Sequence, residues 1–278
     1  MKSAVKIHNL TKQYDSKFQL NVDLEIPKGM IIGLIGENGA GKTTLMKSML
    51  DIIHPEQGTI SFEKGSEHIG VVLDQSFFPE ILTPMDIHHI MKDIYSTWDA
   101  DMYFRYMKDF DLPLHKAIKT MSKGMRKKLE IATAFSHHPS LLILDEPTSG
   151  LDPVVRSEVL DLFLEFIQDE NHTILFSTHI TSDLEHIADY IIFLDDGKII
   201  LKENRDTLLE EYGVLKCSEK EWKTIDPKDY VAYKKGKYQY ELLVTDQKRM
   251  KKKYPNMVVD RISLEELMVL TIKGVKVC

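Results

Sequence analysis

The chain has few cysteines and no long apolar stretch. Only Cys217 and Cys278 occur among its 278 residues, so a framework of disulfides is excluded and a reducing compartment is favoured. No apolar run approaches the roughly 18 residues that a membrane-spanning helix needs, and the first ten residues lack the apolar segment of a signal peptide. We therefore expect a cytosolic protein that reaches a membrane only through a partner.

Charge is plentiful but unevenly distributed along the chain. The formal net charge is −7, yet residues 216–278 hold 15 Lys and Arg against 9 Asp and Glu. The shift in composition near residue 215 predicts one domain over residues 1–214 and an accessory domain over residues 215–278. The default interpretation of the basic surplus in the second domain is an ordinary solvated surface. The alternative is a surface that faces membrane headgroups or nucleic acid.

A glycine-rich loop follows an apolar run near the N-terminus. Residues 30–36, MIIGLIG, are typical of a strand buried on both faces of a mostly parallel sheet. Residues 36–43, GENGAGKT, fit the pattern G-x-x-x-x-G-K-[ST], and a helix is expected over about residues 42–52. In such a loop the backbone N–H groups bind phosphates, Lys42 reaches the β- and γ-phosphates, and the Thr43 hydroxyl ligates Mg²⁺. The loop therefore predicts a site for a magnesium nucleotide.

An acidic pair ends a second apolar strand about a hundred residues later. In residues 141–152, LLILDEPTSGLD, four apolar residues precede Asp145 and Glu146. A carboxylate at the tip of a strand beside the phosphate loop is placed to hold Mg²⁺, which is the role expected of Asp145. Glu146 is then positioned to orient or polarise an attacking water. Together with the phosphate loop, the pair predicts hydrolysis of the nucleotide.

A histidine ends a third apolar strand. Residues 172–180, HTILFSTHI, read as a further buried strand of the same sheet, with His179 at its end. A lone histidine is more often structural than catalytic. However, open α/β sheets bind their ligands at this edge, so we expect His179 to contact the γ-phosphate.

With these three segments the chain resembles the ATP-binding subunits of ABC transporters, over about residues 1–214. The resemblance identifies the phosphate loop as Walker A and the strand before the acidic pair as Walker B. It implies that Tyr14 stacks on adenine, that Gln75 contacts Mg²⁺ and the water, and that Asp152 belongs to the D-loop SGLD. The residues expected to contact the nucleotide are Tyr14, Gly36, Glu37, Asn38, Gly39, Ala40, Gly41, Lys42, Thr43, Thr44, Ser122, Lys123, Gly124 and Asp152. The catalytic residues are expected to be Glu146, His179, Gln75 and Lys42, and the Mg²⁺ ligands Thr43, Gln75 and Asp145.

The family signature, usually L-S-G-G-Q, departs from its pattern in this chain. Residues 121–125 read MSKGM, so Ser122 and Gly124 are retained, Lys123 replaces a glycine and Met125 replaces the glutamine. The retained residues open a helix whose dipole points at a γ-phosphate. This form resembles the subgroup that exports antibiotics and antimicrobial peptides through a separately encoded membrane subunit.

The resemblance implies a fold and a set of partners. The fold class is α/β, with a P-loop NTPase (ABC ATPase) core, an antiparallel β layer, a helical subdomain over about residues 77–140, and a small C-terminal α/β extension. The cofactors implied are ATP and Mg²⁺. The partners implied are a membrane permease and a second ATP-binding subunit, bound head to tail so that each ATP lies between one phosphate loop and the other signature. No nucleic acid is expected, and the location implied is the cytoplasm, peripheral on the inner face of the cell membrane through the permease.

Two other functions remain open at this point. One is an ATP-dependent clamp on nucleic acid or ribosomes, although such family members usually carry two cassettes or long coiled-coil insertions, and this chain has neither. The other is a regulatory subunit that binds ATP with little turnover, which fits the altered signature. Neither the transported substrate nor the identity of the second subunit follows from the sequence.

Local patterns predict further details of the elements. Alternating apolar residues over residues 18–26 indicate a half-buried strand. Asp152 before Pro153 predicts a helix cap, and Ser182 with Glu185 predicts a capping box. A second capping box is expected at Ser263 with Glu266, and hairpins are expected to turn near residues 196–197 and 235–236.

Overall fold

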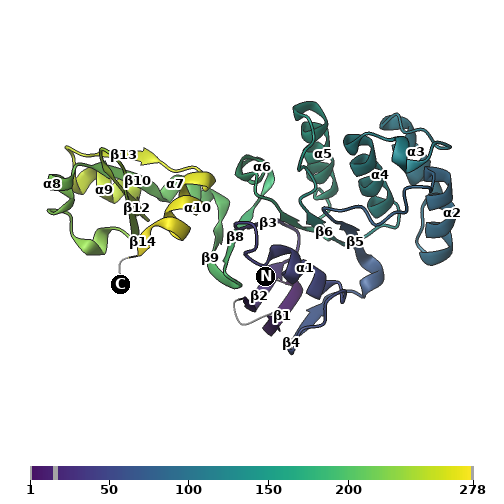
Figure 1. The fold of residues 1–278 in the computed structure, drawn as a ribbon, viewed down its shortest axis with the longest axis horizontal. Helices are drawn as coiled ribbons and strands as arrows, with labels where there is room; N and C mark the ends of the chain where they lie inside the picture. The colour runs from purple at the N-terminus through teal and green to yellow at the C-terminus, as the bar shows by residue number, and fades with distance from the viewer. Residues whose placement is uncertain (1, 15–17, 277–278) are drawn as a thin grey trace.

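The computed structural model describes residues 2–14 and 18–276 of the chain. Figure 1 shows a molecule in which the N-terminal strands and the helices α1 to α6 surround a central sheet, and the C-terminal elements lie to one side. The elements in chain order are β1 (Ser3–Gln13), β2 (Gln19–Pro27), β3 (Ile31–Ile35), α1 (Lys42–Met49), β4 (Gln57–Phe62), η1 (Ser66–His68), β5 (Ile69–Val72), α2 (Pro84–Ile94), α3 (Ala100–Asp109), η2 (Ile118–Thr120), α4 (Lys123–Phe135), β6 (Leu141–Asp145), α5 (Pro153–Phe166), β7 (Thr173–Ser177), α6 (Thr181–Ile187), β8 (Tyr190–Asp195), β9 (Lys198–Asn204), α7 (Arg205–Glu211), β10 (Gly213–Cys217), α8 (Glu219–Trp222), η3 (Pro227–Asp229), β11 (Ala232–Lys235), β12 (Tyr240–Val244), α9 (Gln247–Lys253), β13 (Val258–Arg261), α10 (Leu264–Lys273) and β14 (Val275–Lys276).

The central sheet brings three sequence motifs to one edge. Its strand order is β5-β6-β7-β3-β8-β9, and its pairs are parallel except for the hairpin β8–β9. Every residue of β3, β6 and β7 is buried, as their continuous apolar runs predict. Since β7 lies between β3 and β6, the phosphate loop, Glu146 and His179 all follow neighbouring parallel strands at the same end of the sheet.

Each face of this sheet is covered by a different layer. The sheet β2-β1-β4 is antiparallel and packs with α1 against one face, where Ile32, Leu34 and Ile143 are buried. Along β2 burial alternates residue by residue, which confirms the half-buried strand predicted there. Helices α4, α5 and α6 cover the opposite face, where Leu142 and Phe176 are buried.

Helices α2, α3 and α4 form the region that was expected to be helical. They enclose a hydrophobic cluster of their own, which includes Ile87, Tyr103, Met107 and Leu129. Phe78 packs against this cluster, whereas the side chain of Phe77 is 53% exposed. Within the described residues no helix is both long and apolar enough to cross a membrane.

The C-terminal elements build a second sheet that packs onto the first unit through α10. Its order is β13-β10-β12-β11-β14, and all of its pairs are antiparallel. The hairpins β8–β9 and β11–β12 turn where the sequence predicts. Leu264 and Leu267 on α10 are fully buried in the same cluster as Leu184 and Ile187 on α6. The division of the chain into two domains near residue 215 stays a prediction.

One predicted helix cap is wrong. Helix α6 begins at Thr181 after Ile180, and no side chain caps it, so Ser182 and Glu185 form no capping box. Both side chains bind distant groups instead, because Arg156 donates to the Ser182 hydroxyl and the Leu264 backbone N–H donates to Glu185. The cap at Asp152 and the capping box of Ser263 with Glu266 are confirmed.

Candidate functional site

A hollow of about 310 Å³ lies at the edge of the central sheet where the three motifs meet. Its walls come from the segment between β1 and β2, the phosphate loop, the start of α1, the segment after β5 and the end of β6. The lining residues are Tyr14, Phe18, Asn38, Gly39, Gly41, Lys42, Thr43, Thr44, Asp74, Asp145 and Glu146. Half of the site residues that the sequence predicts, from separate segments of the chain, therefore line one cavity.

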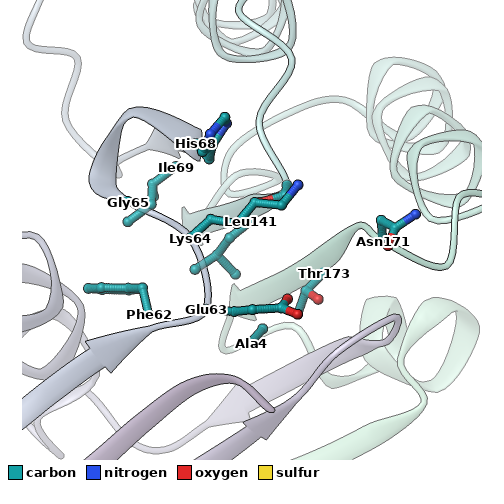
Figure 2. A pocket seen from close by; sticks show the side chains of 11 residues that line it. Ala4, Phe62, Glu63, Lys64, Gly65, His68, Ile69, Leu141, Asn171 and Thr173 are labelled. Atoms are coloured by element: carbon teal, nitrogen blue, oxygen red, sulfur yellow. The ribbon is translucent and has the colours of Figure 1, made fainter. Parts of the chain in front are cut away.

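Another cavity, at the opposite end of the sheet, is too small for a ligand. It is lined where β5, β6 and β7 begin, for example by Ile69, Leu141 and Thr173 (Figure 2). Its volume of about 10 Å³ is close to that of a single water site. The candidate site is therefore at the phosphate-loop edge.

The phosphate loop turns sharply between β3 and α1. Gly39 and Gly41 have φ angles of 88° and 110°, which residues with a side chain rarely adopt, and Gly41 occupies the N-cap of α1. The Lys42 side chain lies under the loop and donates to the carbonyl oxygens of Gly36 at 2.7 Å and Glu37 at 3.3 Å. The loop and the N-terminus of α1 therefore line the hollow, and a helix N-terminus is an arrangement that suits an anion.

Among the residues that the structure describes, Lys42 is the one cation that lines this hollow. Its side chain is only 7% exposed, and burial lowers the pKa of its ammonium group, while the carboxylates of Glu146 and Asp145 act in the opposite direction. An ammonium group that is partly desolvated gains more from an anion than one in water does. The site therefore favours a negatively charged ligand such as a polyphosphate.

Asp145 connects the phosphate loop to two neighbouring strands. Its Oδ2 accepts a hydrogen bond from the Thr43 hydroxyl at 2.9 Å, and its Oδ1 accepts one from the Ser177 hydroxyl at 2.5 Å. Asp145 is 2% exposed, so these bonds fix its orientation. A hydroxyl and a carboxylate oxygen from two elements at this distance are the donor types that Mg²⁺ prefers, so the residues fit a magnesium site.

Glu146 and His179 form a second pair at the same edge. Glu146 Oε2 lies 2.8 Å from Nδ1 of His179, and the Thr178 hydroxyl is 3.4 Å from the same oxygen. The backbone of Glu146 has a φ of 50°, an uncommon conformation for a residue with a side chain, and its N–H donates to the Ser177 carbonyl at 3.0 Å. Glu146 thus lines the hollow directly after β6, with its carboxylate in contact with His179.

Gln75 lies in an adjoining hollow rather than in the first hollow itself. That hollow has a volume of about 410 Å³ and shares Thr43, Asp74 and Asp145 with the first. Tyr14 is 54% exposed, and its ring centroid lies 6.3 Å from that of Phe18. Sequence reasoning missed Phe18 and Asp74, although each lies close in the sequence to a residue that it singled out.

The signature residues do not line either hollow. Ser122 caps α4 by accepting from the Met125 N–H at 3.2 Å. A Cβ added at Gly150 would lie 2.5 Å from Lys123 Nζ, so the Lys123 side chain rests against the segment that also carries Asp152. The described residues therefore place Ser122, Lys123, Gly124 and Asp152 together, apart from the phosphate loop.

The C-terminal unit also touches the phosphate loop. Lys273, at the end of α10, lies with its Nζ 3.0 Å from Glu37 Oε1. Both side chains are about half exposed, so the ion pair contributes little stability. The contact was not predicted, because nothing in the sequence relates these two positions.

The central sheet carries a glycine-rich phosphate loop, a hydroxyl and a carboxylate of the types that Mg²⁺ prefers, and a second carboxylate beside a histidine. This combination is typical of a P-loop nucleoside triphosphatase. Comparison with known proteins gives the family. The model of the ABC transporter family matches residues 20–149. The chain is 35% identical over 219 residues to the lantibiotic transport ATP-binding protein SrtF of Streptococcus pyogenes, which covers 73% of this chain and 91% of SrtF.

Further similarities agree with this match. The bacitracin transport ATP-binding protein BcrA of Enterococcus faecalis is 34% identical over 216 residues, 73% of this chain and 70% of BcrA. The solved structure of an ATP-binding subunit of an ABC transporter is similar with a TM-score of 0.66 and 26% identity, over 74% of this chain and 92% of that one. The chain belongs to the family of ABC transporter ATP-binding proteins, and it is an ATPase that serves transmembrane transport.

Proposed function

We propose that two ATP-binding subunits join head to tail around Mg-ATP and that hydrolysis separates them, which powers export through a separately encoded permease. The observation that carries this proposal is the placement of Ser122 and Gly124 outside the cavity of their own chain. A helix N-terminus that presents a serine and a glycine suits a phosphate, but within one chain it has no phosphate to bind. A second chain supplies it, so ATP stabilises the dimer.

We propose the following roles within each site. Lys42 and the loop N–H groups bind the β- and γ-phosphates, and Tyr14 stacks on the adenine. Thr43, Asp145 and Gln75 hold Mg²⁺, which neutralises charge on the transferring phosphoryl group.

Glu146 and His179 act on the attacking water and the γ-phosphate. The Glu146 carboxylate orients or deprotonates the water, and it is within hydrogen-bond distance of His179 Nδ1. Because the carboxylate and the phosphate are both acceptors, His179 serves both only with a proton on each ring nitrogen, so that Nδ1–H donates to Glu146 and Nε2–H donates to the γ-phosphate.

The adjoining hollow is the proposed contact with the membrane subunit. Phe77 is 53% exposed and Ile52 is 58% exposed, and both line this hollow together with Gln75. Exposed apolar side chains around a hollow are typical of a surface that binds another protein. A permease seated here would place this ATPase on the inner face of the cell membrane, and it would act directly on the segment that carries Gln75.

The relatives indicate the class of cargo. SrtF and BcrA are described as transport ATP-binding proteins for a lantibiotic and for bacitracin. We infer that this chain drives export of a similar antibiotic, peptide or lipid-like molecule. The clamp on nucleic acid or ribosomes is not favoured. A low-turnover regulatory subunit is the second candidate, because Lys123 and Met125 replace signature residues; measuring turnover with and without the permease separates the two.

A Glu146→Gln variant tests the dimer. The amide keeps the size of the side chain but cannot accept a proton, so hydrolysis should fall by about 10²–10⁴-fold while ATP binding persists. Size-exclusion chromatography with light scattering should then show twice the mass of the 32.1 kDa chain in Mg-ATP and the single mass without nucleotide. Adding Lys42→Ala, which weakens phosphate binding, gives the matched control and should restore the single mass. A single mass at saturating Mg-ATP would contradict a homodimer.

A further inference from the structure

Helix α4 carries a buried ion pair outside the site described above. Nζ of Lys127 lies 2.9 Å from Oε2 of Glu130, and the two side chains are only 4% and 5% exposed. Removing two charges from water is expensive, and apolar residues of similar volume are often at least as stable. Stability alone therefore does not explain this pair. Its role is better judged from the other group that Lys127 contacts, the backbone carbonyl of Leu73.

Lys127 also holds the backbone at the start of the segment that carries Gln75. Its Nζ donates to the carbonyl oxygen of Leu73 at 2.8 Å. Leu73 follows directly on β5, which is the edge strand of the central sheet, and precedes Asp74 and Gln75. Lys127 thus donates a hydrogen bond to the Leu73 carbonyl, while its contact with Glu130 Oε2 is an ion pair without hydrogen-bond geometry.

The neighbouring residue of α4 holds the other end of the same segment. Nη1 of Arg126 donates to Glu80 Oε1 at 2.8 Å, and its Nε and Nη2 donate to the carbonyls of Met121 and Lys119 at 3.2 Å each. Residues 74–79 are thus held at both ends by consecutive side chains of α4. The Arg126–Glu80 pair is partly exposed, whereas the Lys127–Glu130 pair is buried and the bond from Lys127 to the Leu73 carbonyl is partly buried.

Helix α4 begins at the signature, and the same helix contacts the segment that carries Gln75 through Lys127. Lys127 follows Gly124 by less than one helical turn. The hydrogen bond from Lys127 to the Leu73 carbonyl is a direct contact through which a displacement of the N-terminus of α4 would reach this segment. From there it would reach Asp74, which lines the nucleotide hollow, and Gln75, which lines the adjoining hollow with Thr43 and Asp145.

We propose that the Lys127–Glu130 pair is a positioning device for hydrolysis. It couples the signature helix to the Gln75 segment, so that Gln75 meets Mg²⁺ and the attacking water only when α4 is in place. Glu130 fixes the Lys127 side chain, and Lys127 fixes the Leu73 carbonyl. This inference rests on the proposed function, because it assigns Gln75 to the hydrolysis site and the N-terminus of α4 to the ATP of a second chain.

The test replaces both charges at once, which avoids leaving one buried charge without a partner. In Lys127→Met/Glu130→Met the volumes are kept but the contact with Leu73 is lost. The matched control is Lys128→Met/Glu158→Met, which removes a second ion pair of α4 that is directed to α5 instead. A polar version, Lys127→Gln/Glu130→Gln, serves if the apolar variant folds poorly.

ATP Kd and Tm report a general loss of structure, whereas kcat and the Mg²⁺ dependence of the rate report the positioning of Gln75. The expected result is an ATP Kd and a Tm close to those of the wild type, a kcat about tenfold lower, and a several-fold higher Mg²⁺ concentration for half-maximal rate. The control pair should leave all four quantities unchanged. Wild-type kcat and Mg²⁺ dependence in the Lys127/Glu130 variant would overturn the proposal.

Hydrogen exchange tests the contact independently of activity. Backbone amides of residues 73–80 should exchange faster in Lys127→Met/Glu130→Met than in the control pair, because their anchor is gone. Unchanged exchange would overturn the inference even if the chain is an active ATPase. Absence of hydrolysis by the wild type with its permease would instead contradict the proposed function, and the exchange data would still judge the contact.

Discussion

The buried His137 should make the free energy of unfolding of this ATPase fall at acidic pH. Its side chain lies beyond the end of α4, is 3% exposed, and stacks on Tyr95 with ring centroids 4.1 Å apart. Its backbone carbonyl accepts from the Thr97 hydroxyl at 2.7 Å, so this residue joins α4 to the segment after α2. Burial lowers the pKa of the imidazole to about 4 from its ordinary value of 6.5.

The sign and size of the effect follow from linkage. Between pH 6.5 and pH 4 the unfolded chain binds a proton at His137 that the folded chain does not, so stability is present above about pH 6.5 and is lost as the pH falls toward 4. At 1.36 kcal/mol per pKa unit, the free energy of unfolding should fall by about 2 kcal/mol between pH 7 and pH 5 through this group alone. That is a change of about 20-fold in the unfolding equilibrium.

Urea denaturation of the wild type and of His137→Phe at both pH values measures this contribution. Phenylalanine keeps an aromatic face against Tyr95 but cannot bind a proton. The wild type should therefore lose about 2 kcal/mol more than the variant between pH 7 and pH 5. Equal losses in the two proteins would refute the assignment of the pH dependence to this buried ring.

Two other substitutions test the surroundings of the site. Asp183 is 2% exposed and accepts from Thr148 and Arg156, so Asp183→Asn should lower the free energy of unfolding by about 3 kcal/mol; an unchanged urea midpoint would contradict a buried ion pair. Tyr14→Ala should weaken ATP binding by about 1–3 kcal/mol in calorimetry, while Tyr14→Phe should not. The same Kd in the alanine variant would remove Tyr14 from the adenine site.

Patterns that depend on consecutive residues were readable from the sequence. The apolar runs before the phosphate loop, before Asp145 and before His179 predicted buried parallel strands, because such strands have no polar face. Once those strands share a sheet, the residues after them meet at one edge, as the bond between Thr43 and Asp145 shows. The caps at Asp152 and Ser263 are local in the same sense.

Features that depend on distant partners were not readable. Ser182 and Glu185 match a capping box, but Arg156 and the Leu264 N–H compete for those side chains, and tertiary contacts prevail over a short local motif. Lys127 and Glu130 belong to a run that resembles an ordinary charged helix face. Their burial depends on β5, which the chain reaches more than fifty residues earlier.

Recovery of partners from native membranes tests the central claim most directly. The tagged chain with Glu146→Gln would be purified in Mg-ATP from detergent-solubilised cells that contain it naturally, and the co-purifying proteins would be identified by mass spectrometry. The account predicts a membrane protein with several spanning helices in fixed ratio to two ATP-binding subunits, and it predicts that this complex weakens without ATP. Recovery of ribosomal proteins or nucleic acid, with no membrane protein, would contradict it.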